Sequence, residues 1–360
     1  MSVPTPPTPA APNPAAAEPA PKTGLNRAGL AVADYKGLPS TLCKGCGHDV
    51  ITNAIISSFH EMGVEPHLVA KMSGIGCSSK TTAYLLSRGW GFNAVHGRMP
   101  SVATGAVLAN RKLVAIGVSG DGDTASIGMG QFVHMVRRNV PIIYIVENNG
   151  VYGLTKGQFS ATADQGSKLK SGEINDLPPV DLCTLAIELG CGFVARSFSA
   201  DRKQLVALLK AAIAYDGTAV LDVMSPCVTF NNHEGSTKSY DYGRDHEGQI
   251  HELGFVAGWE SPDVEFKDQE SIQVPLPDGG TILVRRVDGA HDPRDKAAAF
   301  KLLRESDPAK EFLTGLFYLQ PGKPSLLDML KVDDAPLANL PIGRTRPPST
   351  VLDQIVDSLR

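Results

Sequence analysis

Two polar motifs, about 25 residues apart, each follow an apolar segment of the kind expected for a buried strand. Gly120-Asp121-Gly122-Asp123 follows residues 113–118, and Asn148-Asn149-Gly150-Val151 follows residues 141–146. In an open parallel sheet, ligands bind at the carboxyl ends of the strands, so the two motifs are expected to lie side by side. The Asp121 carboxylate, the Asn149 amide oxygen and the Val151 carbonyl form an oxygen set suited to Mg²⁺ that carries a diphosphate.

Main-chain N–H groups beside these motifs are expected to bind the diphosphate. Gly122 and Asp123 precede a predicted crossover helix, whose amino end favours an anion. Gly153 and Leu154 offer similar groups from the second loop. The alternative is that Asp121 only caps the next helix, but the paired motifs favour the metal site.

Four of the six cysteines are expected at the same sheet edge. Cys43 and Cys46 have CxxC spacing, and Cys77 and Cys227 come just after predicted strands that end at residues 72 and 224. Four thiolates suit a [4Fe–4S] cluster. A zinc knuckle is disfavoured because no second CxxC or His pair follows. A thioredoxin-type dithiol is disfavoured because no matching strand precedes the motif.

The segments between these motifs alternate between helical and strand patterns, which predicts a doubly wound parallel sheet with right-handed crossovers. Strands are expected at 67–72, 91–95, 113–118, 141–146, 191–197 and 219–224, and helices at 48–62, 78–87, 101–110, 126–138, 181–189 and 201–215. Residues 228–262 show no clear period. Further on, the pattern predicts a hairpin over 271–287 and helices at 297–303 and 309–318.

Composition gives a three-part division of the chain. Residues 1–22 are mostly Pro and Ala and are expected to form a disordered tail. Residues 23–260 are expected to form the α/β domain, and residues 261–360 a C-terminal appendage that packs on a partner subunit or caps the core. Cys183 and Cys191 lie among apolar neighbours and are expected to pack in the core.

Charge and hydropathy narrow the function classes. The net charge of −4 gives no reason to expect a nucleic-acid partner, and no apolar run reaches the length of a membrane span. Six irregularly spaced cysteines in 360 residues are untypical of a secreted disulfide framework. A reduced, cytoplasmic location is the expectation.

Taken together, the motifs resemble a known family. The GDG…NN spacing alone is similar to the thiamine-diphosphate fingerprint. Over residues 38–245 the chain resembles the β subunit of 2-oxoacid:ferredoxin oxidoreductases. The motifs that carry this resemblance are CKGCGH (43–48), GIGCSS (74–79), HGR (96–98), GDGD (120–123), NNGVYGLTKGQ (148–158) and SPC (225–227). Lys44 stands where the family usually has Pro.

This resemblance implies a pyrophosphate-domain fold that binds thiamine diphosphate and Mg²⁺ beside one [4Fe–4S] cluster. The implied cluster ligands are Cys43, Cys46, Cys77 and Cys227, and the implied Mg²⁺ ligands are Asp121, Asn149 and Val151. The residues implied to line the cofactor are Ile75, Gly76, Cys77, Ser78, His96, Gly122, Asp123, Gly153 and Leu154. The glutamate that such enzymes need for the pyrimidine ring comes from a second similar domain, so an α subunit is expected to carry it, in an α2β2 heterotetramer.

The implied reaction is the reversible oxidative decarboxylation of a 2-oxoacid with coenzyme A, in which electrons pass to ferredoxin. Lys156 and the HEGSTKSYDYG stretch at 233–243 resemble the 2-oxoglutarate enzymes, with pyruvate as the alternative. Lys156 would bind the substrate carboxylate, or is a solvated lysine. His48 would hydrogen-bond cofactor or substrate, or caps its helix. The polar residues 231–234 would order the loop over the cluster or face a partner.

Two other classes of protein remain as alternatives. A non-redox thiamine decarboxylase or synthase would keep GDG…NN but would not need the four thiolates. An assembly module with structural zinc would keep the cysteines but would not need Asp121 and Asn149 in register.

Overall fold

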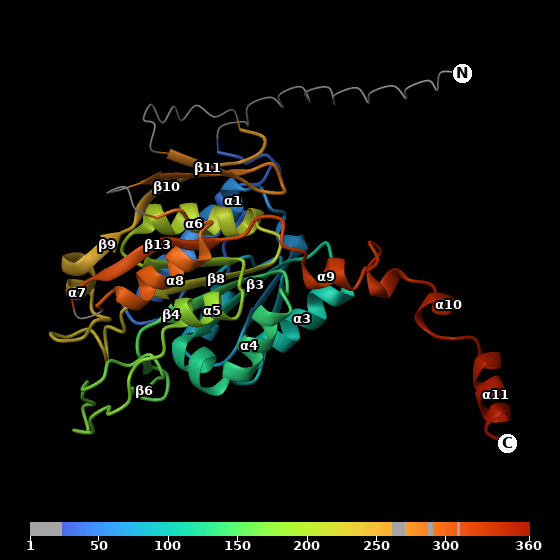
Figure 1. Cartoon of the computed structure of the whole chain (residues 1–360), viewed down its shortest axis with the longest axis horizontal. Helices are drawn as coiled ribbons and strands as arrows, with labels where there is room; N and C mark the ends of the chain where they lie inside the picture. The colour runs from blue at the N-terminus through green and yellow to red at the C-terminus, as the bar shows by residue number, and fades with distance from the viewer. Residues whose placement is uncertain (1–23, 261–270, 287–290, 308–309) are drawn as a thin grey trace.

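The computed structural model describes residues 24–260, 271–286, 291–307 and 310–360. Its centre is an eight-stranded sheet with the strand order β2-β1-β3-β4-β8-β7-β13-β9 (Figure 1). The first six strands in that order are parallel, whereas β13 runs antiparallel to β7. The strands are β1 (Val69–Ser73), β2 (Trp90–Asn93), β3 (Val114–Gly120), β4 (Ile142–Asn148), β7 (Phe193–Phe198), β8 (Thr218–Met224), β9 (Glu247–Gln249) and β13 (Phe312–Leu319).

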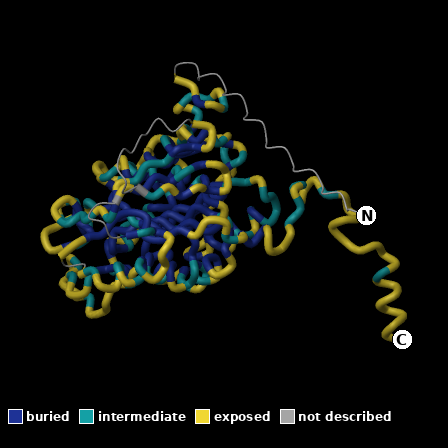
Figure 2. Tube along the Cα trace, turned by 45° about the horizontal axis from the view of Figure 1, so that its top comes forward, coloured by how far each residue is buried: buried dark blue, intermediate teal, exposed yellow. Residues whose placement is uncertain are grey.

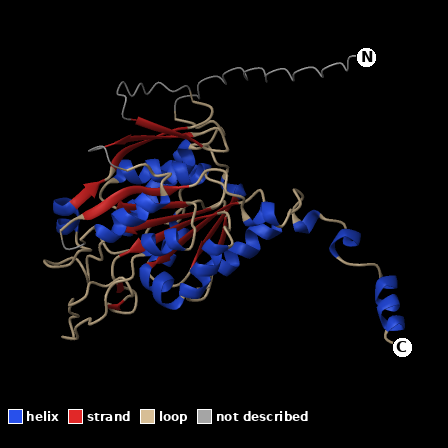
Figure 3. Ribbon diagram, in the orientation of Figure 1, coloured by secondary structure: helices blue, strands red, loops and turns tan. Residues whose placement is uncertain are grey.

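Helices cover both faces of this sheet (Figure 3). Along β4, Ile143 and Ile145 join the core on one face, while Ile142, Tyr144 and Val146 join the core on the other. Because a strand presents alternate residues to opposite faces, a strand covered on both sides reads as one apolar run. The first face packs against α1 (Gly47–Glu61) and α6 (Arg202–Ala214), and the second against α3 (Met99–Ala109), α4 (Met129–Arg137), α5 (Leu182–Glu188) and α8 (Lys296–Glu305). The predicted doubly wound α/β fold is confirmed.

Two helices differ from their predicted extents. The helix expected over 78–87 is a 3-10 turn (Ser78–Lys80) followed by the short α2 (Thr81–Tyr84), and the backbone is extended at Leu85. The crossover helix after the first polar motif begins with a π-helical turn, Asp123–Ile127, before α4. π-helical turns occur frequently at functional sites.

The helix expected over residues 309–318 is wrong, because Phe312–Leu319 form strand β13. All eight residues of β13 are buried between β7 and β9. A short run that is buried all round has no period, so its pattern cannot distinguish a helix from a strand. Its Phe, Tyr and Thr residues suit a strand. A strand of the main sheet therefore comes from the range expected to form an appendage.

The stretch 228–262, which has no clear sequence period, also contains regular elements: α7 (Tyr240–His246), β9 and β10 (His251–Val256). β10 pairs with the predicted hairpin of β11 (Ser271–Pro275) and β12 (Thr281–Arg286). This three-stranded sheet shares a core with α1 and α6 through Val274, Ile282 and Val284. It lies above those helices in Figure 1.

The C-terminal end leaves the body as an exposed arm (Figure 2). After α9 (Leu326–Met329) and a 3-10 turn (Leu337–Asn339), the helices α10 (Ile342–Thr345) and α11 (Ser349–Ser358) bury no residue. The predicted tail of residues 1–22 lies outside the described residues. Within the described ranges, no helix has the length and apolar character needed to cross a membrane.

Candidate active site

A cavity of about 410 Å³ opens at the edge of the sheet where β1, β3 and β4 end. It is lined by loops that follow those strands, together with the start of α1 and a short hairpin of β5 (Val151–Tyr152) and β6 (Gln158–Phe159). The residues predicted to contact Mg²⁺ and thiamine diphosphate all line it. The lining residues are His48, Ile75, Gly76, Cys77, Ser78, His96, Gly120, Asp121, Gly122, Asp123, Ile127, Glu147, Asn149, Val151, Tyr152, Gly153, Leu154, Thr155 and Gln158.

Asp121 is almost wholly buried directly after β3, and its carboxyl group has only neutral donors around it. Oδ2 accepts hydrogen bonds from the hydroxyls of Thr162, at 2.7 Å, and of Ser160. The N–H of Asn149 lies 3.4 Å from Oδ1. Burial raises the pKa of Asp121, and these hydrogen bonds lower it in part. Among the described residues no Lys, Arg or His forms an ion pair with it, so a bound cation would supply the missing positive charge.

The oxygen donors around Asp121 fit a hard divalent ion. Asn149 is held in place because its Oδ1 accepts from the N–H of Val151 at 3.1 Å, and both residues line the cavity with Asp121. Nowhere in the described ranges do three His, Cys, Asp or Glu side chains gather around one point as a metal site. This does not conflict with a Mg²⁺ site built from one carboxylate, one amide, one carbonyl and phosphate oxygens.

The two aspartates of the GDGD motif have different partners. The Asp123 carboxylate accepts from the N–H of Gly97 at 2.8 Å and from the Ser119 hydroxyl at 2.9 Å. It therefore ties the loop that carries His96 to the end of β3. Gly122 has no room for a side chain, because a Cβ there would lie 2.4 Å from the ring of Tyr152.

The four candidate cluster cysteines come from three loops that meet beside the cavity. A Cβ on Gly153 would lie 3.5 Å from the Sγ of Cys77 and 3.6 Å from the Sγ of Cys227. Cys43 is linked to the Cys227 loop by the Thr229 hydroxyl, 3.5 Å from its Sγ. The N–H of Cys46 bonds to the carbonyl of Cys43 at 3.0 Å.

Burial and the neighbouring thiols shift the pKa values of two candidate ligands upward. Burial raises the pKa of Cys46 to about 12. The pKa of Cys77 is raised by burial, and then by the neighbouring Cys227 and Cys43. Thiols with raised pKa values become thiolates when a metal binds them. In a [4Fe–4S] cluster each cysteine binds a different iron, so the cysteines need not converge on one point.

Comparison with known proteins agrees with this geometry. A family model for the C-terminal TPP-binding domain of thiamine pyrophosphate enzymes matches residues 74–223. The chain is 42% identical to the β subunit of a 2-oxoacid:ferredoxin oxidoreductase from Sulfolobus sp over 221 residues, which cover 61% of this chain and 70% of that one. The chain belongs to this family of oxidoreductase β subunits.

Other relatives of the β subunit are named for 2-oxoglutarate. The 2-oxoglutarate synthase subunit KorB of Methanocaldococcus jannaschii is 36% identical, over 54% of this chain and 71% of its own. The 2-oxoglutarate:ferredoxin oxidoreductase of Magnetococcus marinus, solved with 2-oxoglutarate, coenzyme A and succinyl-CoA bound, has a TM-score of 0.68 at 30% identity. That match covers 84% of this chain and 89% of the other.

His48 of the β subunit is buried at the start of α1 and faces the cavity. Burial lowers its pKa to about 4, so the ring is neutral at neutral pH. Its Nδ1 lies 2.6 Å from the Ser225 hydroxyl and 3.5 Å from a carboxyl oxygen of Glu147. Glu147 is fully buried, receives hydrogen bonds from Thr81 at 3.3 Å, and has its pKa raised by burial.

Lys156 of the β subunit is exposed on the turn between Thr155 and Gln158. Those two residues line the cavity, whereas Lys156 is not among the described residues that do. Its φ of 83° lies in the left-handed region, which is strained for a residue with a side chain. The turn thus holds Lys156 at the cavity rim in an unusual backbone conformation.

Sequence reasoning missed three side chains at the site: Glu147, Ser160 and Thr162. Glu147 is a charged residue at the end of an apolar strand, directly before Asn148, and that position could have indicated it. Ser160 and Thr162 contact Asp121 from 39 and 41 residues further along the chain. Only the β5–β6 hairpin brings them back, and no local pattern marks that return.

Proposed function

We propose that this chain is the thiamine diphosphate-, Mg²⁺- and [4Fe–4S]-binding β subunit of a 2-oxoglutarate:ferredoxin oxidoreductase. The reaction converts 2-oxoglutarate, coenzyme A and two oxidised ferredoxins to succinyl-CoA, CO₂, two reduced ferredoxins and a proton. Bound thiamine diphosphate supplies the electron sink for decarboxylation, and the cluster supplies a one-electron acceptor.

One observation supports this function above the others. Gly153 lines the oxygen-rich cavity and also lies beside the Sγ atoms of Cys77 and Cys227. A site for a diphosphate cofactor and a set of thiols therefore share one loop. A non-redox thiamine enzyme would have no use for that proximity, and a zinc module would have no use for the buried Asp121.

Each group of residues in and beside the cavity would bind a different part of the cofactors or the substrate. Asp121, Asn149 and the Val151 carbonyl would hold Mg²⁺, and the main-chain N–H groups of 122–123 and 153–154 would bind the diphosphate. Residues 75–78 and His96 would contact the rest of the cofactor. Neutral His48 would donate or accept one hydrogen bond to cofactor or substrate, and Lys156 would pair with a substrate carboxylate at the rim. The thiolates of Cys43, Cys46, Cys77 and Cys227 would bind the cluster.

The site would be completed by an α subunit, in an α2β2 assembly. His96, Ile127 and Leu154 line the cavity yet are exposed to solvent, as expected for a surface that another chain covers. The exposed Leu352 and Ile355 of α11 suit a second subunit contact. The isolated β subunit should be inactive, and full turnover by this polypeptide alone would contradict the split site.

The test is anaerobic purification of the complex formed with its α subunit. We expect a brown protein with about four irons per β subunit, bound thiamine diphosphate and a reducible cluster. Among a panel of 2-oxoacids, 2-oxoglutarate should reduce ferredoxin with the highest kcat/KM. A colourless zinc protein would overturn the proposal. A higher kcat/KM for pyruvate would overturn the choice of substrate.

A further inference from the structure

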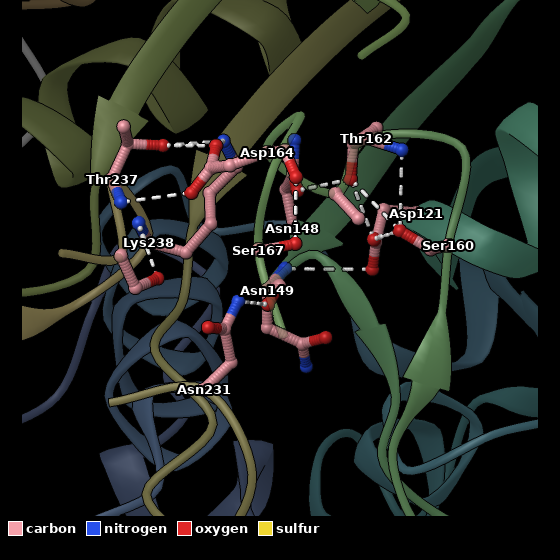
Figure 4. Close-up of polar contacts among 12 residues, drawn as sticks. Asp121, Asn148, Asn149, Ser160, Thr162, Asp164, Ser167, Asn231, Thr237 and Lys238 are labelled. Carbon is pink, nitrogen blue, oxygen red and sulfur yellow. Dashed lines mark hydrogen bonds and ion pairs between the residues drawn. The ribbon is translucent and has the colours of Figure 1, made fainter. Parts of the chain in front are cut away.

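The segment 227–240 begins at a candidate cluster cysteine and includes most of the HEGSTKSYDYG stretch. The function proposed above gives no task to the rest of the segment. Its side chains contact both halves of the site, and Figure 4 shows those on the cofactor side. Three sets of contacts connect the segment to the loops around the site.

The first contact joins the Cys227 turn to residues 149–151, which we call the metal loop because they include the candidate Mg²⁺ ligands Asn149 and Val151. The N–H of Asn231 bonds to the carbonyl of Cys227 at 2.9 Å, so the two residues form one tight turn. The buried Asn231 side chain then donates to the carbonyl of Asn149 at 2.9 Å. The position of Cys227 is thereby fixed relative to a candidate Mg²⁺ ligand.

The second contact is an ion pair with the loop that supports Asp121. Lys238 Nζ lies 3.1 Å from Asp164 Oδ1, and both side chains are largely buried, with 10% and 17% of their surface exposed. Thr237 adds two hydrogen bonds to the same carboxylate, at 2.9 Å from its N–H and 2.6 Å from its hydroxyl. Asp164 follows Ser160 and Thr162, so the segment is anchored to the loop that orients Asp121.

The third contact reaches the first cysteine loop. The Tyr240 hydroxyl donates to the carbonyl of Gly45 at 3.2 Å, and the Thr229 hydroxyl lies 3.5 Å from the Sγ of Cys43. Packing also ties the segment to the metal loop. A Cβ on Gly150, whose φ is +75°, would lie 2.9 Å from the Asn231 amide nitrogen and 3.3 Å from Lys238 Cγ.

We propose that residues 227–240 form a clamp that fixes the distance between the cysteine loops and the metal loop, with Asn231 and Lys238 as its positioning residues. The clamp's role rests on the proposed function, because it sets the path of electrons from the cofactor to the cluster. Electron-transfer rates fall steeply with distance, so a loosened clamp slows this step before it empties either site. Outer contacts of this kind affect activity by about 10–100-fold.

The test compares Lys238→Met and Asn231→Ala with the wild-type complex, with Lys238→Arg as the conservative variant. Lys168→Met is the matched control, because Lys168 is an exposed lysine of a neighbouring loop. Three quantities are measured: iron and thiamine content, the rate at which the 2-oxoacid substrate bleaches the cluster, and hydrogen exchange of 149–164 and 225–240.

We expect Lys238→Met and Asn231→Ala to slow substrate-driven bleaching about 10-fold while dithionite still bleaches the cluster fully. Exchange should accelerate in both segments, and Lys238→Arg should restore most of the rate. Wild-type bleaching and exchange in both variants would overturn the clamp. If the Lys238→Met protein does not fold, the bleaching rate and hydrogen exchange of Asn231→Ala alone test the clamp. Wild-type complex without iron or thiamine would overturn the proposed function instead.

Discussion

Two buried aspartates at the same edge of the sheet, Asp121 and Asp222, have opposite surroundings. Asp121 follows β3 and Asp222 lies in β8, and the two strands flank β4. Asp222 Oδ2 accepts from Arg196 Nε at 3.1 Å, and Oδ1 accepts from the Asn148 amide at 2.9 Å. Asp121 accepts hydrogen bonds only from neutral groups. The two aspartates are nevertheless close neighbours, because the Thr162 hydroxyl contacts both Asp121 and Asn148, the residue that donates to Asp222.

This difference separates a carboxylate that has its positive partner within the chain from one that does not. A buried carboxylate without a positive partner is costly. At Asp222 the chain supplies the cation itself, so the pair belongs to the scaffold. At Asp121 it supplies hydroxyls and an open cavity, which is where we propose that a bound cation supplies the positive charge. A buried acid with neutral partners beside a cavity is therefore the feature that separates a binding site from a structural ion pair.

The largest expected effect is on the scaffold side. Arg196→Met leaves Asp222 buried without its cation and also removes the ion pair between Arg196 and the more exposed Asp181. We expect the free energy of unfolding to fall by about 3–5 kcal/mol. Denaturant unfolding of the purified chain measures this. The control is Arg294→Met, which removes an exposed ion pair with Asp292 and should cost at most about 1 kcal/mol. Equal losses in the two variants would break the comparison.

Asp121→Ala should weaken cofactor binding and leave the stability of the chain nearly unchanged, the opposite of what is expected for Arg196→Met. Removing this carboxylate takes away the charge that would hold Mg²⁺, and we expect thiamine diphosphate to bind at least about 100-fold more weakly. The iron content and the free energy of unfolding of the apo chain should change little, because no cation is left unpaired. Titration with thiamine diphosphate and Mg²⁺ measures the affinity. Cofactor content equal to that of the wild type would refute the Mg²⁺ assignment.

Most of the fold and the cavity wall could be predicted from the sequence, because they depend on local patterns. Apolar runs of strand length, each followed by a polar motif, predicted which loops meet at the sheet edge. The residues of GDGD, Asn149 and Val151 of NNGV, and the Ile75–Ser78 loop all line the cavity as a result. Spacing along the chain is enough when a parallel sheet brings its strand ends together.

What the sequence could not show depends on contacts between distant segments. Ser160 and Thr162 reach Asp121 only through the β5–β6 hairpin, and Arg196 reaches Asp222 only because β7 and β8 are neighbours. The strand β13 was predicted as a helix because a fully buried run has no period. In each case the deciding information is a partner in space.

A buried histidine tests whether burial and a neighbouring side chain, without a bound ion, explain a large pKa shift. His251 in β10 is fully buried, and its Nε2 accepts from the N–H of Leu316 at 2.9 Å. Burial, and then the nearby His291, lower its pKa to about 3. In the unfolded chain the pKa is about 6.5, so acid protonates the unfolded state first. The stability that neutral His251 gives is present above about pH 6.5 and is lost as the pH falls toward 3.

We expect the wild-type chain to lose about 2 kcal/mol of unfolding free energy between pH 7 and pH 5 from this group. His251→Gln keeps an acceptor for Leu316 but cannot titrate, so it should flatten the pH dependence over this range. His233→Gln, at an exposed position, is the control and should follow the wild type. If His251→Gln and the wild type lose stability in parallel, the shift does not come from this residue.

The smallest expected effect returns to Asp121 and asks what its neutral partners contribute. With Oδ2 held by Thr162 and Ser160, Oδ1 is left to face Asn149 and the cavity. Thr162→Val keeps the shape of the side chain and removes the hydroxyl, so we expect Mg²⁺ and thiamine diphosphate to bind about 10-fold more weakly. Thr162→Ser should retain the affinity. Thr155→Val, whose hydroxyl bonds to Gln158 and lies on the cavity wall, controls for loss of a hydroxyl there. Wild-type affinity in Thr162→Val would mean that burial alone, and not the orientation of the carboxylate, prepares Asp121 for the metal.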